Sequence, residues 1–327
     1  MIKTLLSSVP RIRIANLPTP IEKLPRLAAK ISVSELLIKR DDLTGLAFGG
    51  NKTRKLEYLI ADALSHGAKT LITSGAVQSN HCRQTAAAAA KFGLDCYLVL
   101  TGDSPQHYSG NLLLDYLFGA ELVWCERERR EMVTQETFQR LWQEGKRPYL
   151  IPYGGSNSLG VIAYAHAMIE LDEQGVVADW IVFPSSSGGT QAGLVLGSKI
   201  CGFKGNIVGI SVDLDSAQLG QRISNLIAET INTYSLPVKA DGSEIDIKDA
   251  YRGRGYGLPT DDDLQAVRDF AKYEGLLLDP VYTGRAAAGM IDLVRQGAIP
   301  SDASVLFWHT GGTPALFAEN YTKLLSD

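Results

Sequence analysis

Apolar runs of strand length alternate along almost the whole chain with longer runs that have helical periodicity. The runs that predict strands are residues 36–39, 70–73, 96–100, 149–152, 180–183, 207–212 and 305–308. The runs that predict helices are residues 82–92, 110–117, 160–170 and 190–200. Strands that alternate with helices form mostly parallel sheets covered by helices, with functional loops at the carboxyl ends of the strands. The pattern therefore predicts an α/β protein.

Composition narrows the class of protein. The chain has 327 residues, of which 45% are hydrophobic and 21% are charged, as in globular proteins of about two domains. A formal net charge of -4 gives no indication of a nucleic-acid or membrane-surface partner. We see no signal peptide and no run of membrane-spanning length, so we expect a cytoplasmic protein. The four cysteines and five histidines lack metal-ligand spacing, so we expect no metal site.

A lysine extends the apolar face of one predicted helix. In the segment GGNKTRKLE, two glycines permit a tight turn and Asn51 is a candidate N-cap. Lys52 lies four residues before Leu56 and so continues the inward face of the helix. Burial and the positive end of the helix dipole both lower the pKa of a lysine, which makes its amine reactive toward a carbonyl cofactor. The alternative is a lysine whose charged end reaches solvent.

A Ser/Gly loop between a predicted strand and a predicted helix has the composition of a phosphate site. Its residues are Ser186, Ser187, Gly188, Gly189 and Thr190. The backbone N–H groups of such a turn converge on an anion, and Lys55, one turn after Lys52, supplies a second cation. The loop is neither a Walker A motif nor a dinucleotide fingerprint, which argues against a nicotinamide-dependent oxidoreductase. A plain strand-to-helix loop is the alternative.

Another loop presents short polar side chains at a predicted helix start. Ser79, Asn80 and His81 open the alanine-rich helix, where they suit recognition of a carboxylate or a ring hydroxyl. Simple capping of the helix by Ser79 or Asn80 explains the same residues.

Three further residues lie in turns near the end of the chain. Thr310 follows the last predicted strand and precedes two glycines, which allow a ligand to approach the backbone closely. Tyr256 and Tyr282 lie beside proline and glycine, a setting in which tyrosine packs more often than it catalyses. No single loop therefore decides the function.

Together these motifs resemble the D-cysteine desulfhydrase and 1-aminocyclopropane-1-carboxylate deaminase family. The resemblance extends nearly end to end and rests on PTP at 18–20, KRDD at 39–42, GGNKTRKLE at 49–57, QSNH at 78–81, DPVYTG at 279–284 and HTGG at 309–312. The family consists of pyridoxal 5'-phosphate enzymes with the tryptophan synthase β-like fold of type II. The resemblance implies two three-layer αβα domains with mostly parallel sheets, the cofactor in the cleft between them, and a homodimer.

The resemblance also implies domain boundaries and residue roles. A small domain of residues 48–159 is inserted in a large cofactor-binding domain of residues 1–47 and 160–327. The implied catalytic residues are Lys52, as Schiff-base lysine and general base, with Ser79 and Tyr282. The implied cofactor-binding residues are Lys52, Lys55, Asn80 (at the ring hydroxyl), Ser186, Ser187, Gly188, Gly189, Thr190 and Thr310. The implied substrate-binding residues are Ser79, Asn80, His81, Tyr256, Tyr282 and Thr283.

Two positions distinguish the branches of this family. The deaminases have a glutamate after the tyrosine of DPVY and a leucine before the final two glycines, whereas this sequence has Thr283 and Thr310. A threonine hydroxyl can hydrogen-bond the pyridine nitrogen but brings no negative charge, so the electron sink is weaker. That favours elimination of a good leaving group. We therefore expect a D-cysteine desulfhydrase-like lyase that converts a small amino acid to pyruvate, sulfide and ammonia.

Other functions stay open. L-cysteate sulfo-lyases are similar to this family, and the motifs do not exclude that substrate or another β-substituted amino acid. Cyclopropane ring opening is disfavoured by Thr283 and Thr310. A non-catalytic binder of pyridoxal phosphate is disfavoured by the joint presence of Lys52, Ser79 and Tyr282.

Overall fold

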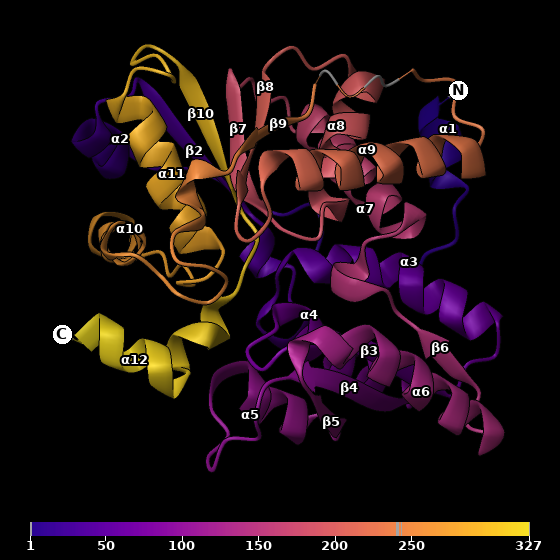
Figure 1. Ribbon diagram of the computed structural model, residues 1–327. Coiled ribbons are helices and arrows are strands. Elements are labelled where there is room, and N and C mark those ends of the chain that lie inside the picture. Colours follow the sequence, from indigo (N-terminus) through magenta and orange to yellow (C-terminus); the bar gives the residue numbers. More distant parts are fainter. Residues whose placement is uncertain (1, 240–241, 243, 327) are drawn as a thin grey trace.

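The computed structural model describes residues 2–239, 242 and 244–326, and these residues form two sheets (Figure 1). The larger sheet has the order β1 (Ile21–Lys23), β2 (Glu35–Arg40), β10 (Ser304–His309), β7 (Trp180–Ser185), β8 (Asn206–Ser211) and β9 (Asp246–Lys248). The smaller sheet has the order β5 (Glu121–Cys125), β4 (Asp95–Thr101), β3 (Thr70–Ala76) and β6 (Pro148–Leu150). Within these two sheets only the β1–β2 pairing is antiparallel. The predicted α/β class with mostly parallel sheets is confirmed.

Helices cover both faces of each sheet. The helices are α1 (Ile2–Ser7), α2 (Pro25–Ile31), α3 (Asn51–Ser65), α4 (Asn80–Phe92), α5 (Gly110–Leu117), α6 (Arg130–Gln143), α7 (Ser158–Glu173), α8 (Gly189–Cys201), α9 (Ser216–Thr233), α10 (Asp261–Glu274), α11 (Thr283–Arg295) and α12 (Glu319–Ser326). Apolar cores lie on one side of the larger sheet under α7, α8 and α9, and on the other under α2, α10 and α11. The smaller sheet packs against α3 and α4 on one face and α6 on the other. Both units therefore have three layers.

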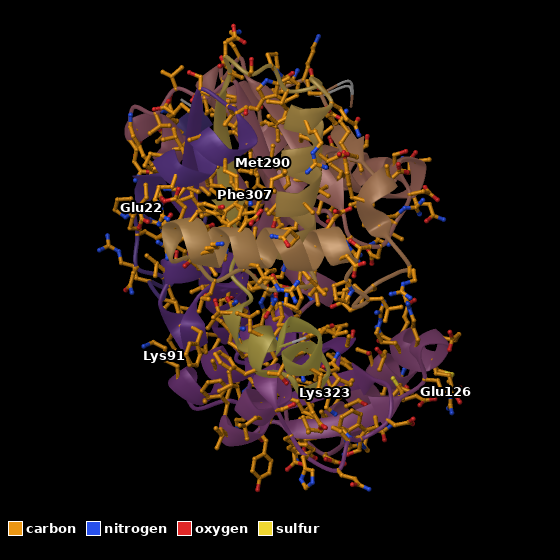
Figure 2. The ribbon with its side chains drawn as sticks, turned by 90° about the vertical axis from the view of Figure 1, so that its left-hand side faces the viewer. Glu22, Lys91, Glu126, Met290, Phe307 and Lys323 are labelled. Carbon is orange, nitrogen blue, oxygen red and sulfur yellow. The ribbon has the colours of Figure 1, made fainter. Side chains whose placement is uncertain are left out.

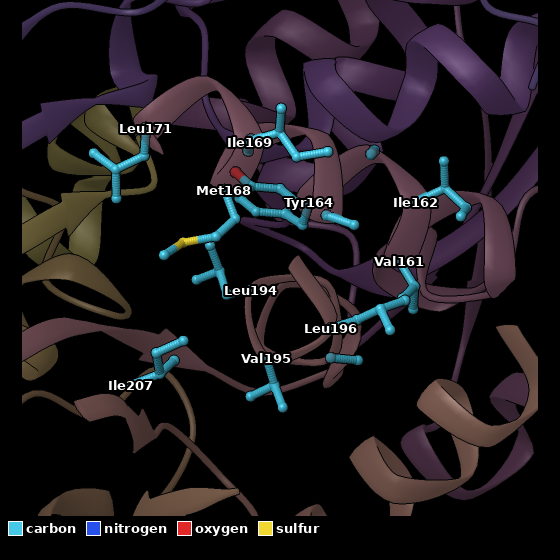
Figure 3. Close-up of a cluster of buried hydrophobic side chains, with 14 of the residues drawn as sticks. Val161, Ile162, Tyr164, Met168, Ile169, Leu171, Leu194, Val195, Leu196 and Ile207 are labelled. Carbon is cyan, nitrogen blue, oxygen red and sulfur yellow. The ribbon is translucent and has the colours of Figure 1, made fainter. Parts of the chain in front are cut away.

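The closest helix packing in the large unit depends on two glycines. A Cβ at Gly193 of α8 would collide with Tyr164 of α7, and one at Gly197 would collide with Met168. Glycine at both positions lets the two helices approach closely, and their apolar side chains form one buried cluster (Figure 3). This packing holds α8, whose N-terminus carries the Ser/Gly loop, against the rest of the unit.

The distribution of side chains is that of a globular protein. Glu22, Lys91 and Glu126 lie at the outer surface, whereas Met290 and Phe307 are fully buried (Figure 2). No helix among the described residues is both long and apolar enough to cross a membrane. In the same part of the chain, no group of three or more His, Cys, Asp or Glu side chains could hold a metal ion.

Each sheet takes its strands from its own part of the chain. All four strands of the smaller sheet fall within residues 48–159, and all six of the larger sheet fall within 1–47 and 160–327. The short strands β1, β5 and β9 were not predicted from the sequence. They are three, five and three residues long and lie at sheet edges, so their apolar patterns are too short to be recognised.

Candidate active site

One cavity gathers residues from the carboxyl ends of strands in both sheets. Its walls come from the loops after β3, β6, β7 and β10, the first turn of α3, and the turn before α11. The predicted site residues that line it are Lys52, Ser79, Asn80, His81, Ser186, Ser187, Gly188, Thr190, Tyr282 and Thr310. The predicted residues that do not line it are Lys55, Gly189, Tyr256 and Thr283.

An N-cap at Asn51 would make Lys52 the first helical residue, but the helix begins one residue earlier. Gly50 is the N-cap, with φ 123°, and Asn51 is the first helical residue. Asn51 is held from both sides, because its backbone N–H donates to Thr310 O (2.9 Å) and its side-chain amide donates to Thr190 Oγ1 (3.1 Å). The N-cap prediction for Asn51 is therefore wrong. Its side chain instead ties α3 to the Ser/Gly loop.

Lys52 points into the cavity without a partner. Within the described part of the chain, its amine makes no hydrogen bond or ion pair, and Leu56 on the same helix face is fully buried. Burial lowers the pKa of Lys52 to about 8. About a tenth of the amine is thus unprotonated at pH 7, far more than for an ordinary lysine, and this is the form that attacks a carbonyl carbon.

Two residues after Lys52, a buried charge network fixes α3 to the large sheet. Arg54 donates to both carboxylate oxygens of Asp41 (2.7 and 2.9 Å) and to both of Glu170 (2.8 and 2.9 Å). Trp308 Nε1 (2.8 Å) and Tyr164 OH (2.6 Å) also donate to Asp41 Oδ2. Although burial acts to raise the pKa of Asp41, Arg54 and these hydrogen bonds hold it below its usual range. The network joins α3, α7 and the end of β10.

The Ser/Gly loop lies next to Lys55. Gly188 adopts φ 84° as the N-cap of α8, a conformation that suits glycine. Lys55 Nζ donates to Gly154 O (3.1 Å) and Ser156 Oγ (3.4 Å), and the N–H of Gly189 donates to the same Oγ (3.2 Å). A Cβ on Gly189 would lie 3.0 Å from Lys55 Nζ. The Lys55 amine therefore lies beside the first turn of α8, and burial together with the nearby Lys52 lowers its pKa well below the usual value.

The loop before α4 combines capping with cavity lining. Ser79 is the N-cap, and its hydroxyl accepts the N–H of Cys82 at 3.2 Å. His81 is buried, and burial together with the nearby Lys52 lowers its pKa well below the usual value. Thr73 Oγ1 donates to Ile151 O (2.9 Å) and lies 2.9 Å from His81 Nε2, so His81 Nε2 is the donor in that contact. His81 is thus a neutral side chain in the cavity wall.

Two tyrosines meet at the opposite wall. The hydroxyl groups of Tyr256 and Tyr282 lie 2.6 Å apart, with the rings edge to face. Burial raises the pKa of both phenols well above the usual value. Both hydroxyls therefore keep their protons at neutral pH, although only Tyr282 reaches the cavity surface.

The two threonines that distinguish the family branches have different surroundings. Thr310 lines the cavity. Thr283 is fully buried, and its hydroxyl donates to Asp279 Oδ1 and accepts the backbone N–H of Asp279, both at 2.8 Å. The Asp279 carboxylate also accepts the N–H groups of Val281 and Tyr282. Thr283 thus braces the turn that presents Tyr282.

Several cavity residues were not among the sequence-predicted site residues. They are Asn51, Tyr153, Gly154, Pro184 and Ser185, with Ser156 beside them. Tyr153–Gly155 (η4) forms a turn after β6, and nothing in the sequence indicated that this turn faces the Ser/Gly loop. Ser156 Oγ and Ser187 Oγ lie 2.8 Å apart, so contact between the two units creates this part of the site.

These residues fit pyridoxal phosphate. The cavity holds an unpaired amine of lowered pKa for the aldehyde, and a helix N-terminus with Lys55 and serine hydroxyls for the phosphate. Ser185 Oγ is buried at this end without a hydrogen-bond partner among the described residues, as expected of a donor that awaits a ligand.

Comparison with known proteins agrees with that fit. A family model described as pyridoxal-phosphate dependent enzyme matches residues 12–311. The chain belongs to this pyridoxal-phosphate enzyme family. Pyridoxal phosphate is therefore its cofactor. A D-cysteine desulfhydrase of Klebsiella pneumoniae subsp. pneumoniae is 44% identical over 322 residues, which cover 96% of this chain and 97% of that protein. A D-cysteine desulfhydrase of Klebsiella pneumoniae strain 342 is 43% identical with the same coverage.

Solved structures confirm the fold of this pyridoxal-phosphate enzyme. A crystal structure described as an ACC deaminase homologue has a TM-score of 0.91 and 40% identity, and the match covers 99% of this chain and 98% of that chain. A threonine deaminase of Solanum lycopersicum has a TM-score of 0.69 at 15% identity, covering 99% of this chain and 86% of that chain. The second similarity shows the shared fold alone.

Proposed function

We propose that this pyridoxal-phosphate enzyme is a D-cysteine desulfhydrase that converts D-cysteine and water to pyruvate, sulfide and ammonia. One observation carries the proposal. Relatives named D-cysteine desulfhydrase are 43–44% identical over 96% of the chain. In agreement with it, one cavity of this protein supplies the groups that a β-elimination needs, which are Lys52, Ser79, Asn80, Tyr282 and Thr310.

Lys52 is the proposed proton carrier at the α-carbon. When bound, pyridoxal phosphate draws electron density from the amino acid and so makes the Cα–H bond acidic. Lys52, displaced by the substrate amine, is then a free amine in a buried setting, where its lowered pKa suits a general base. Ser79, the N-cap of α4 in the cavity wall, and the N–H groups that follow it are the proposed partners of the substrate carboxylate.

Tyr282 is the proposed partner of the leaving sulfur. It keeps its proton at neutral pH because burial raises its pKa. Its hydroxyl lies 2.6 Å from that of Tyr256, a hydrogen bond in which either oxygen can be the donor, and the Tyr282 proton is free for the sulfur when Tyr256 donates. A protonated phenol at this position can donate a hydrogen bond to the departing thiolate. Thr283 supports this function through the Asp279 turn and not through contact with the substrate.

The cavity has no carboxylate. Of the described residues that line it, none is Asp or Glu, and Thr310 is the proposed partner of the pyridine nitrogen. A neutral hydroxyl leaves that nitrogen without the negative charge that would keep it protonated. This favours loss of a good leaving group over the opening of a cyclopropane ring.

Attachment of the cofactor to the apoprotein is expected to depend on pH through Lys52. Only the neutral amine attacks the aldehyde, so the rate constant is expected to rise about tenfold per pH unit below the pKa and to level off above about pH 8. Stopped-flow absorbance after pyridoxal phosphate is added to apoprotein measures this rate. Nα-acetyl-lysine is the control, because its one amine, of pKa about 10.4, shows no plateau below about pH 9. A rate that still climbs between pH 9 and 10 would contradict the buried setting of Lys52.

Product analysis tests the proposed substrate. The purified holoenzyme is offered D-cysteine, L-cysteine, L-cysteate and 1-aminocyclopropane-1-carboxylate in parallel, and keto acid, sulfide and sulfite are measured. Pyruvate with sulfide from D-cysteine is the expected result. Pyruvate with sulfite from L-cysteate would instead identify a sulfo-lyase. Production of 2-oxobutyrate would mean that a neutral hydroxyl at Thr310 suffices for ring opening.

The family resemblance also supports a cytoplasmic homodimer. Sedimentation of the holoenzyme measures the oligomeric state, and a mass near 71 kDa, about twice the 35.4 kDa of one chain, is expected. A mass equal to that of one chain at every protein concentration tested would contradict the proposed dimer.

A further inference from the structure

Behind Asn80 lies a buried guanidinium to which the site described above gives no role. Arg83, three residues further along α4, is fully buried. Its Nη1 donates to Asn80 Oδ1 (3.0 Å) and to Asn111 Oδ1 (2.7 Å), and its Nη2 donates to the carbonyl oxygen of Gly49 (2.8 Å). Arg83 thus connects a cavity residue to the glycine turn that precedes Lys52.

The contacts of Asn80 fix the orientation of its amide. Asn80 Oδ1 accepts one hydrogen bond from Arg83 and one from Asn111 Nδ2, both at 3.0 Å. Asn111 is itself held by Gln78, which accepts the Asn111 N–H (2.8 Å) and side-chain amide (2.9 Å). Because both donors occupy the oxygen of Asn80, its NH₂ group is the part left to face the cavity that Asn80 lines.

The charge of Arg83 has no close counter-charge within the described residues. No acidic group lies within ion-pair distance, and Nε has no hydrogen-bond partner. Two acidic groups act on Arg83 from further away, Asp115 and Asp279. Burial raises the pKa of Asp115 well above its usual range, and Asp279 accepts donors from its own turn. An unpaired buried charge is unfavourable for folding and is typical of functional sites.

We propose that Arg83 is a positioning residue for the cofactor: acting through the oriented amide of Asn80, it stabilises the ring hydroxyl in its ionised form. The negative oxygen then supplies the counter-charge that the guanidinium lacks in the protein alone. The hydrogen bond from Arg83 to Gly49 O holds Arg83 and Asn80 at a fixed position relative to the helix that carries Lys52. The inference rests on the proposed role of Asn80 at the ring hydroxyl.

The pH dependence of the cofactor's visible spectrum tests this inference without substrate. Arg83→Gln removes the charge but keeps an amide donor, so the pKa of the spectral transition is expected to rise by about one unit or more. The Kd for pyridoxal phosphate, from fluorescence titration of apoprotein, is expected to rise on the order of tenfold. Arg83→Lys keeps the charge, so the pKa of its spectral transition is expected to lie close to the wild-type value.

Gln84→Met is the matched control. Gln84 is the next residue on α4, is also buried, and also donates to Gly49 O at 2.8 Å, but its side-chain hydrogen bonds go to Gly49 and Thr53 and not to Asn80. The spectral pKa of this variant is expected to equal that of the wild type. An equal upward shift in Gln84→Met and Arg83→Gln would assign the effect to the Gly49 turn and overturn the inference, as would a wild-type spectral pKa in Arg83→Gln.

Two further variants separate the possible failures. Asn111→Leu keeps the charge of Arg83 and removes the second donor to Asn80, so it tests the amide orientation even if Arg83→Gln does not fold. An upward shift supports the orientation, and a wild-type value contradicts it. A wild-type spectrum in Asn80→Ala would remove the proposed role of Asn80 itself. A shift in Asn80→Ala without one in Arg83→Gln would overturn only the role of Arg83.

Discussion

Replacement of Lys52 by alanine is expected to abolish covalent attachment of pyridoxal phosphate and to reduce turnover by at least about 10³-fold. Two functions are lost together, the amine that anchors the cofactor and the base that takes the α-proton, and loss of proton transfer alone costs on the order of 10²–10⁴. Absorbance of the holoenzyme after removal of free cofactor measures attachment. Release of pyruvate from D-cysteine measures turnover.

The stability of this variant separates a chemical role from a structural one. Lys52 has no partner in the described structure and its charge is disfavoured by burial, so with both proteins compared as apoproteins alanine is expected to leave the urea midpoint unchanged or to raise it slightly. Lys91→Ala, at an exposed lysine of α4, is the control and should retain both cofactor and turnover. Retention of the cofactor band with normal turnover in Lys52→Ala would exclude Lys52 as the anchoring residue.

Replacement of Arg54 by leucine is expected to lower the free energy of unfolding by about 3–5 kcal/mol. The change leaves the carboxylates of Asp41 and Glu170 without the guanidinium that bonds all four of their oxygens. Asp41 is fully buried, so its charge cannot be solvated instead. Urea denaturation followed by circular dichroism measures the loss.

The pH dependence of this loss has a definite sign. Arg54 helps to hold the pKa of Asp41 below its usual range, so the stabilisation is present above the unfolded carboxyl pKa, near about 4, and decreases as the pH falls below it. The difference between wild type and Arg54→Leu is therefore expected to narrow in acid. Arg140→Leu, which removes an exposed i,i+4 pair with Glu144, is the control and should cost at most about 0.5 kcal/mol. A loss in Arg54→Leu no larger than in this control would show that the network does not stabilise the fold.

Local patterns in the sequence determined the element types and much of the cofactor chemistry. The alternation of strand-length and helix-length apolar runs predicted the parallel sheets, because a buried parallel strand must be apolar on both faces. The spacing of Lys52 and Leu56 predicted an inward lysine, because residues four apart share a helix face. The Ser/Gly loop predicted an anion site, because its donors are contiguous in the chain. Each of these features is set by neighbours within a few residues.

Tertiary structure decided which distant groups meet. Ser156 beside Ser187, and Asn80 oriented by Asn111, are contacts between segments about 30 residues apart that no local periodicity encodes. The KRDD segment contributed to the family resemblance, but only the fold shows that its Asp41 accepts hydrogen bonds from Arg54, which also donates to Glu170. Thr283 is the clearest case. Its position in the motif placed it at the substrate, whereas the fold turns its hydroxyl toward Asp279, because the direction of a side chain in a turn depends on what packs around it.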